Sequence, residues 1–219
     1  MIPFRDVIPS RTFPVATLAL LVVAAALFGV RELGAGVRAR DGWIDGLALV
    51  LGHGGRPGFV VDALCLWIFG ETVEDRTGHA RLLLLAGTGI AAGIALGAAL
   101  GSGPAALGTS AVAAVVGAYF ARFARSRVLA LVPIPFAAAI VELPASALLA
   151  AWAVVHLAGA APAGVVDVDT MFRQIAAFGV GALLAVVLAR RERLRADWAL
   201  PNASSPADVP AGERRSGGR

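Results

Sequence analysis

Long apolar runs that carry few charged residues restrict the folds open to this sequence. They approach the roughly 20 residues that an α-helix needs to cross a bilayer. The expected spans are residues 12–30, 59–73, 82–100, 107–123, 138–157 and 175–188. A helix of a water-soluble protein needs a polar face, which these runs lack. The sequence therefore predicts an all-α polytopic membrane protein with six transmembrane helices, and it disfavours a soluble helical protein.

The first apolar run also fits a signal peptide, because a basic start with Arg5 and Arg11 precedes it. Its apolar part is long for a signal peptide and further spans follow, so we interpret it as the first transmembrane helix. The segment 31–57 is too charged to span a membrane. It contains Trp43, which suits the headgroup level, so we expect an interfacial or re-entrant first loop.

Arginine supplies every basic residue of the chain, and the net charge is +4. In a soluble protein such a balance would suggest nucleic acid. Here the arginines lie at the ends of apolar runs, as in the clusters at 122–127 and 190–195, where they set orientation. We therefore expect a multi-pass cell-membrane protein that lies in the lipid bilayer, with both termini cytoplasmic and no nucleic-acid partner.

The chain divides by composition into a membrane domain, residues 1–195, and a tail, residues 196–219. The tail is rich in Pro, Ser, Gly and Arg, so we expect it to be disordered and cytoplasmic. Small residues recur every four positions from Gly89 to Gly101 and from Ala177 to Ala189, which predicts close helix packing within the chain. A homodimer is the alternative interpretation. The single cysteine, Cys65, forms no intrachain disulfide, and no metal or cofactor motif is present.

Several motifs, taken in order, resemble those of the rhomboid family. They are the opening MIPFRD with PSRTFP, His53-Gly54-Gly55, LWIFG followed by VEDR, VLALVPI at 128–134 and VELP at 141–144. The resemblance covers roughly residues 1–190 and implies a rhomboid-like bundle of six transmembrane helices. Rhomboids are intramembrane serine proteases. Their nucleophile is a Ser in a Gly-x-Ser-Gly motif on the fourth helix, their base is a His on the sixth helix, and a His and an Asn on the second helix bind the oxyanion.

The resemblance places Ser110, in Gly108-Thr109-Ser110-Ala111, at the nucleophile position. Phe178 and Gly181 fix the register of the sixth helix, which puts Gln174 at the position of the base. A serine hydroxyl is a poor nucleophile without an adjacent base, and an amide has no useful basicity. The resemblance therefore implies a vestigial nucleophile. Ser110 also fits a simple capping role at the start of a helix.

The two oxyanion positions fall on Gly58 and Asp62. Gly58 lacks a donor side chain, and an ionised Asp62 would oppose a developing oxyanion. A protonated Asp62 could still donate a hydrogen bond. An acid inside a membrane segment indicates a functional site, whereas an interfacial Asp62 would pair with Arg56. We leave both interpretations open.

Other side chains of the chain are candidates to replace the missing base. His53 belongs to the His-Gly-Gly motif near the outer surface, where a structural role is the simpler interpretation, and His156 ends the fifth span. A rewired pair of Ser110 with either histidine is an alternative, as is Asp62 acting as a weak base. His79 falls in a cytoplasmic loop. Glu142 is expected to be a structural hydrogen-bonding group at the start of the fifth helix.

These observations favour a rhomboid-like pseudoprotease that binds the transmembrane segments of client proteins. The alternative is an active intramembrane serine protease, either rewired or aligned differently from the register above. A channel or transporter has little support, because the expected spans contain few charges.

Overall fold

A computed structural model describes residues 2–6, 12–34, 52, 55–102, 107–134, 137–159 and 168–199. The chain divides into two compact units, Met1–Val186 and Val187–Arg219. His53, most of the expected interfacial or re-entrant segment and residues 200–219 lie outside the described residues.

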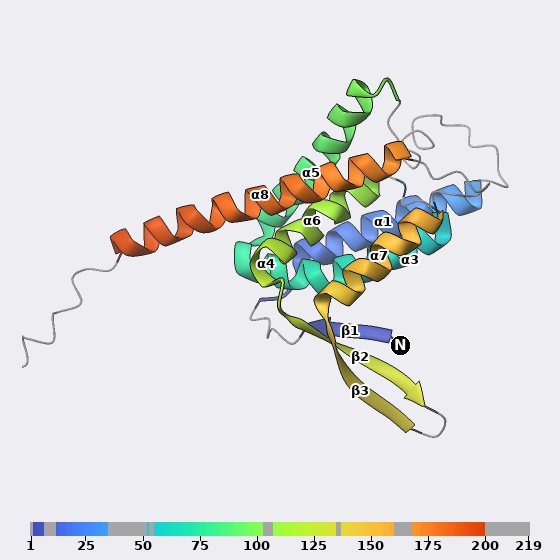
Figure 1. Ribbon diagram of the computed structural model, residues 1–219, viewed down its shortest axis with the longest axis horizontal. Coiled ribbons are helices and arrows are strands. Elements are labelled where there is room, and N and C mark those ends of the chain that lie inside the picture. The colour runs from blue at the N-terminus through green and yellow to red at the C-terminus, as the bar shows by residue number, and fades with distance from the viewer. Residues whose placement is uncertain are drawn as a thin grey trace, which may run out of the picture. The chain divides into compact units, whose positions relative to one another are not determined.

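The described chain is mostly helical (Figure 1). Its helices are α1 (Val15–Gly34), α3 (Gly55–Cys65), the π-helical turn η1 (Leu66–Gly70), α4 (Glu71–Thr77), α5 (His79–Ala99), α6 (Leu107–Phe123), α7 (Ala145–Gly159) and α8 (Val168–Ala199). The turn η1 continues from α3 into α4, so residues 55–77 form one helical run. At Gly70 an added methyl group would lie 3.1 Å from the Thr17 side chain. A glycine there lets η1 pass close to α1.

Two described helices, His79–Ala99 and Val168–Leu188, are long and apolar enough to cross a membrane. Three shorter apolar helices occupy Val15–Val30, Leu107–Phe123 and Ala145–His156. At about 1.5 Å per residue, α6 is about 25 Å long, which approaches the thickness of a hydrocarbon core.

The last helix is longer than the sequence indicated. The expected tail began at residue 196, but α8 continues to Ala199, so residues 196–199 are helical. The segment after residue 188 is rich in Arg, Ala, Leu and Glu, all of which have high helix propensity. Hydropathy detects the end of an apolar run, which here comes before the end of the helix.

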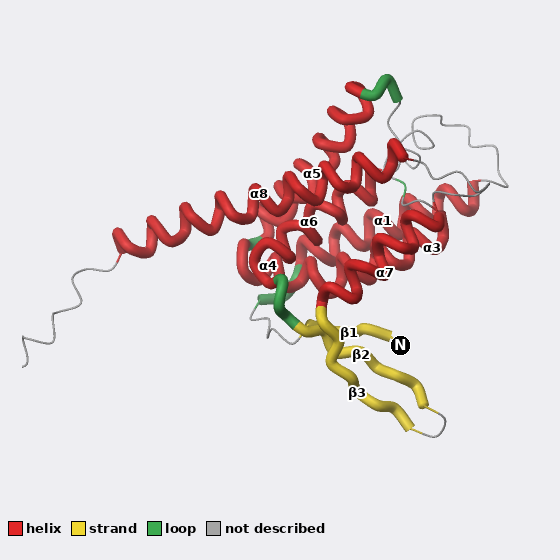
Figure 2. Tube along the Cα trace, viewed as in Figure 1, coloured by secondary structure: helices red, strands yellow, loops and turns green. Residues whose placement is uncertain are grey.

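The chain also contains a three-stranded antiparallel sheet, which corrects the all-α prediction (Figure 2). Its strands are β1 (Ile2–Asp6), β2 (Arg127–Ile134) and β3 (Ala137–Pro144). The central strand β2 pairs with β1 through Ile2 opposite Leu131, and with β3 through Arg127 opposite Pro144. This pairing gives the backbone of the central strand β2 partners on both of its edges, and that of β1 and β3 partners on one edge each.

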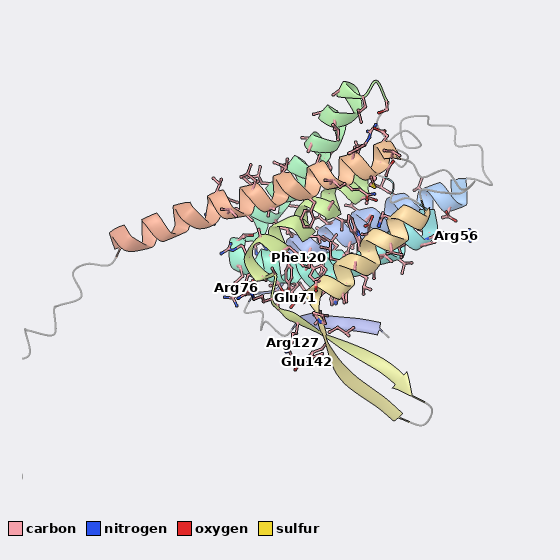
Figure 3. All side chains as sticks on the ribbon, in the orientation of Figure 1. Arg56, Glu71, Arg76, Phe120, Arg127 and Glu142 are labelled. Atoms are coloured by element: carbon pink, nitrogen blue, oxygen red, sulfur yellow. The ribbon has the colours of Figure 1, made fainter. Side chains whose placement is uncertain are left out.

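Strand β3 also corrects the start of the fifth helix. Residues 138–144 were expected to be helical, but they lie in β3, and α7 begins only at Ala145. A short apolar run does not distinguish a strand from a helix, and here pairing with β2 decides the outcome. Glu142 therefore lies on a strand. Its exposed carboxylate pairs with the guanidinium of Arg127 at 3.0 Å (both residues are labelled in Figure 3).

Helix α6 is buried along almost its whole length because glycines of α5 and α8 lie against it. A methyl group at Gly89 would lie 2.4 Å from the carbonyl oxygen of Ser110, and one at Gly181 would lie 2.0 Å from that of Ala114. Glycines at these points allow backbone to approach backbone. At Gly97 the added methyl would meet the guanidinium of Arg173 on α8. The small-residue repeats thus pack within the chain at these positions.

The start of α1 is held by the carboxylate of Glu74 on α4. The amides of Ala16 and Thr17 donate to it at 2.7 Å each, and the Thr17 hydroxyl donates at 2.6 Å. His79 at the start of α5 contacts the same carboxylate. These first-turn amides have no acceptor within their own helix, so Glu74 satisfies them and its charge suits the positive end of α1. Glu74 thereby joins α1, α4 and α5.

Acid is expected to weaken this junction. Burial would raise the pKa of Glu74, but the hydrogen bonds from Thr17, Ala16 and His79 outweigh it and lower the pKa below its ordinary value. A lowered pKa gives stability that is complete above the ordinary value of about 4.3 and is lost as the pH falls through the folded-state pKa. The melting temperature of the protein in detergent should therefore fall more steeply in acid than that of Glu74→Gln. Parallel curves for the two proteins would contradict the prediction.

Candidate functional site

Asp62 on α3 is the centre of a polar cluster in the helical body, and its side chain is fully buried. The Thr109 hydroxyl, at the start of α6, donates to Oδ2 of Asp62 at 2.8 Å. The indole Nε1 of Trp152 on α7 donates to Oδ1 at 2.7 Å. One carboxylate thus joins three helices, α3, α6 and α7. A buried acid requires such donors, since an unpaired one costs several kcal/mol.

His156 on α7 is the fourth member of this cluster. Its Nδ1 lies 2.9 Å from the carbonyl oxygen of Trp152, so this nitrogen donates to the backbone. Its Nε2 lies 3.2 Å from Oδ1 of Asp62, although the contact lacks hydrogen-bond geometry. The contact becomes an ion pair when the imidazole carries its second proton. His156 is therefore oriented by Trp152 and Asp62, as a positioned partner of the acid.

Ser110 follows Thr109 in the first turn of α6 and is 1% exposed. It faces α5, where a methyl group at Gly93 would lie 2.8 Å from its Oγ. Among the described residues, the Ser110 hydroxyl forms no side-chain hydrogen bond. The rewired pair of Ser110 with His156 is not formed, because His156 contacts Asp62 instead. The same acid accepts from Thr109, the neighbour of Ser110.

Gln174 lies on α8 and is 8% exposed. It faces a cavity of about 290 Å³ between α7 and α8. The cavity is otherwise apolar, and its remaining lining residues are Leu149, Trp152, Ala153, Met171, Ile175 and Phe178. Within the described part of the chain, the Gln174 side chain has no hydrogen-bond partner. The structure therefore places an unpaired amide, and no base, at this point of α8.

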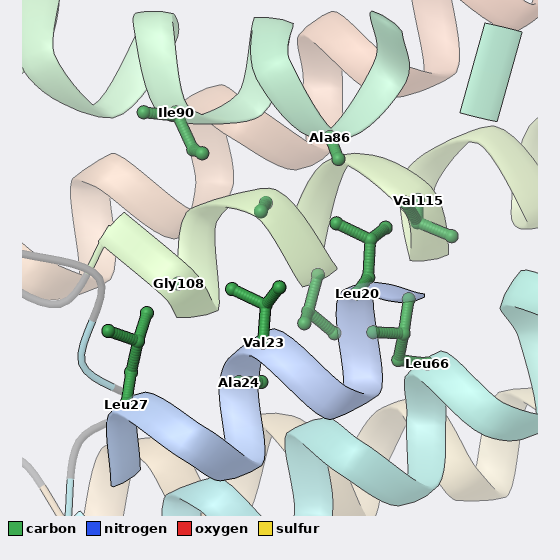
Figure 4. A pocket seen from close by; sticks show the side chains of 11 residues that line it. Leu20, Val23, Ala24, Leu27, Leu66, Ala86, Ile90, Gly108 and Val115 are labelled. Atoms are coloured by element: carbon green, nitrogen blue, oxygen red, sulfur yellow. The ribbon is translucent and has the colours of Figure 1, made fainter. Parts of the chain in front are cut away.

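The start of α6 separates two environments. Thr109 faces the Asp62 cluster, whereas Gly108 and Ala111 line a second, apolar pocket of about 80 Å³ between α1, η1, α5 and α6. Figure 4 shows Leu20, Val23 and Leu27 of α1 directed at this pocket, with Gly108 across from them. Gly108 thus lies at close helix contacts and carries no reactive group.

Three further expected sites can be placed. Gly58 is buried in the first turn of α3, one turn before Asp62. Arg56 pairs with Glu32 of α1 at 2.5 Å, so its ion-pair partner is not the Asp62 that the sequence suggested. Gly181 lies against α6, as described above. Among the described residues, no group of three or more His, Cys, Asp or Glu side chains could hold a metal ion.

Sequence reasoning missed Thr109 and Trp152 as partners of Asp62. A signal was available, since Trp152 and His156 are one helical turn apart and are both polar-tipped residues in an apolar run. It also missed Arg173, which is 1% exposed beside Gln174. Arg173 donates to Asp169 at 2.7 Å, and to the Ser102 hydroxyl at 2.7 Å. Arg173 thereby ties α8 to the end of α5.

The geometry thus brings an acid, a histidine and a threonine together, and leaves the Ser110 hydroxyl and the Gln174 amide without partners among the described residues. Comparison with known families matches the chain to the Rhomboid domain over residues 41–191. The match covers more than half of the chain, and the motif at the N-terminus lies before it. No curated protein and no solved structure matches the chain.

Proposed function

Because the chain belongs to the rhomboid family of membrane-embedded proteins, we propose that it is a rhomboid without protease activity that binds transmembrane segments of other proteins. The observation that carries the proposal is the Asp62 cluster. The family resemblance assigns Asp62 to a position that needs a neutral hydrogen-bond donor. Here that position holds an acid that accepts from Thr109 and Trp152 and contacts His156.

The chemistry of the dyad positions supports the same conclusion. Attack by Ser110 requires removal of its proton, and the resemblance assigns that task to the residue at position 174. Gln174 is an amide and cannot accept the proton at neutral pH. His156, the histidine of α7, is directed at Asp62. Dyad members act as a unit, so the loss of the base removes most of the rate that the pair supplies.

The topology that accompanies this function has six transmembrane helices and both termini in the cytoplasm. The arginine clusters after α6 and within α8 support this orientation. Two of the six are the long apolar helices, three are the apolar helices shorter than 18 residues, and the sixth is the helical run of α3 and η1. The shorter ones would cross with the support of their neighbours. The binding function is supported by the apolar cavity between α7 and α8, which opens among side chains that suit an apolar segment.

A serine-directed probe tests the loss of activity. The purified protein in detergent is treated with a fluorophosphonate, alongside Ser110→Ala and an active serine hydrolase that checks the probe. We expect the same background labelling of both forms of this protein, because no base activates Ser110. Cleavage of a model transmembrane substrate should be absent in both. Labelling that disappears in Ser110→Ala would contradict the proposal and favour an active protease.

A further inference from the structure

The cavity between α7 and α8 has the chemistry of a binding site for one kind of transmembrane helix. We propose that it receives a helix from another protein which carries an uncharged polar side chain, such as an asparagine or glutamine amide, opposite Gln174. This inference rests on the proposed function, because it names the kind of segment that the protein binds.

The Gln174 amide is the observation that carries the inference. It is more than nine-tenths buried, it faces the cavity, and it has no hydrogen-bond partner among the described residues. The amide offers two donors and one acceptor oxygen that open to the cavity, and these stay unpaired when only apolar side chains fill it. A partner helix that supplies a matching amide avoids this cost. The remaining wall, which includes Trp152, Met171 and Phe178, accepts apolar side chains of the same helix.

The lining of the cavity favours a helix over a lipid headgroup. None of the residues that line it carries a charge that could bind a phosphate or an amine of a headgroup. Gln174 lies six residues into the apolar part of α8, Val168–Leu188. Acyl chains have no hydrogen-bonding group to offer its amide. A polar side chain on a transmembrane helix does, and such side chains bond across helices.

The lining of the cavity is also uncharged. Trp152 forms part of its α7 side, and its indole is held by Asp62 at 2.7 Å. The nearby Arg173 is already bonded to Asp169 and Ser102, and it does not line the cavity. A neutral amide therefore fits better than a carboxylate or an amine. A volume of about 290 Å³ holds a few side chains of a helix that docks along α7 and α8.

Energy transfer in phosphatidylcholine vesicles tests the inference. The probe is a polyleucine transmembrane peptide with one asparagine about six residues inside its apolar stretch, and the comparison is the all-leucine peptide. The protein carries a donor dye at its C-terminus, and each peptide carries the acceptor dye. We expect the asparagine peptide to bind about three- to tenfold more tightly than the leucine peptide. Gln174→Leu should remove this preference, whereas Gln174→Asn should retain it. The control Leu183→Ala, at an exposed position of α8, should leave it unchanged.

The outcomes separate this inference from the proposed function. Equal binding of both peptides, or a preference that survives Gln174→Leu, would overturn the inference and leave a general binding function standing. Binding of neither peptide would overturn the inference and the binding part of the proposed function together. Gln174-dependent energy transfer between two labelled copies of this protein, with none to the peptides, would identify a second copy as the occupant and would also overturn it. Each variant is first compared with wild type by thermal unfolding.

Discussion

Asp62→Ala is expected to lower the free energy of unfolding by about 3–5 kcal/mol, because two buried donors lose their acceptor at about 1–3 kcal/mol each and a cavity is left. The change leaves the Thr109 hydroxyl and the Trp152 indole without their acceptor, and it removes the carboxylate that His156 contacts. It also removes a side chain that joins α3, α6 and α7. Denaturation in mixed micelles, followed by circular dichroism, measures the effect. A loss below about 1 kcal/mol would contradict this account of the cluster.

The alternative partner of Asp62 provides the matched control. Arg56 is 80% exposed and pairs with Glu32, so Arg56→Ala should change the free energy of unfolding by no more than about 1 kcal/mol. If Asp62 instead depended on Arg56, the two variants would lower the free energy of unfolding by similar amounts.

A double-mutant cycle of Asp62→Ala with Trp152→Phe should give a coupling energy of about 1 kcal/mol or more, because the two side chains share one hydrogen bond.

The positions of helices could largely be predicted from the sequence, since long apolar runs have few alternatives to a helix in lipid. Helix α6 occupies the same residues as the fourth expected span. The sheet could not be predicted in this way. Strand β3 is as apolar as a helix, and its conformation depends on pairing with β2, which precedes it, and through β2 on β1 at the start of the chain. Hydropathy contains no information about such pairing.

For the candidate site, too, the sequence predicts some features and not others. Residue types along the chain were enough to identify Ser110, Gln174 and Asp62, because their chemistry departs from, or agrees with, a family motif. Their partners depend on how helices pack. Thr109 and Trp152 are 47 and 90 residues from Asp62 along the chain, and the sequence does not tell how close these side chains lie in space. The same applies to Arg173, whose burial follows from the glycine at position 97 of another helix.

Gly181→Ala is expected to be the most damaging small substitution in α8, at about 3 kcal/mol or more of lost stability. The added methyl would lie 2.0 Å from the carbonyl oxygen of Ala114 and 2.6 Å from its Cα. Both are backbone atoms of a buried helix, so no side chain can rotate away and α6 and α8 must separate. Thermal unfolding in detergent should show a large fall in melting temperature, or no folded protein at all.

Gly179→Ala is the matched control, because an added methyl there meets nothing within 4 Å. It lies two residues away on the same helix, and the higher helix propensity of alanine should leave stability unchanged or raise it by about 0.5–1 kcal/mol. The pair therefore separates close packing from helix propensity. Equal melting temperatures for the two variants would show that α8 does not lie against α6 at Ala114. The place of Gln174 in the helical body depends on that contact, so the same result would also remove the geometric support for the cavity that Gln174 lines between α7 and α8.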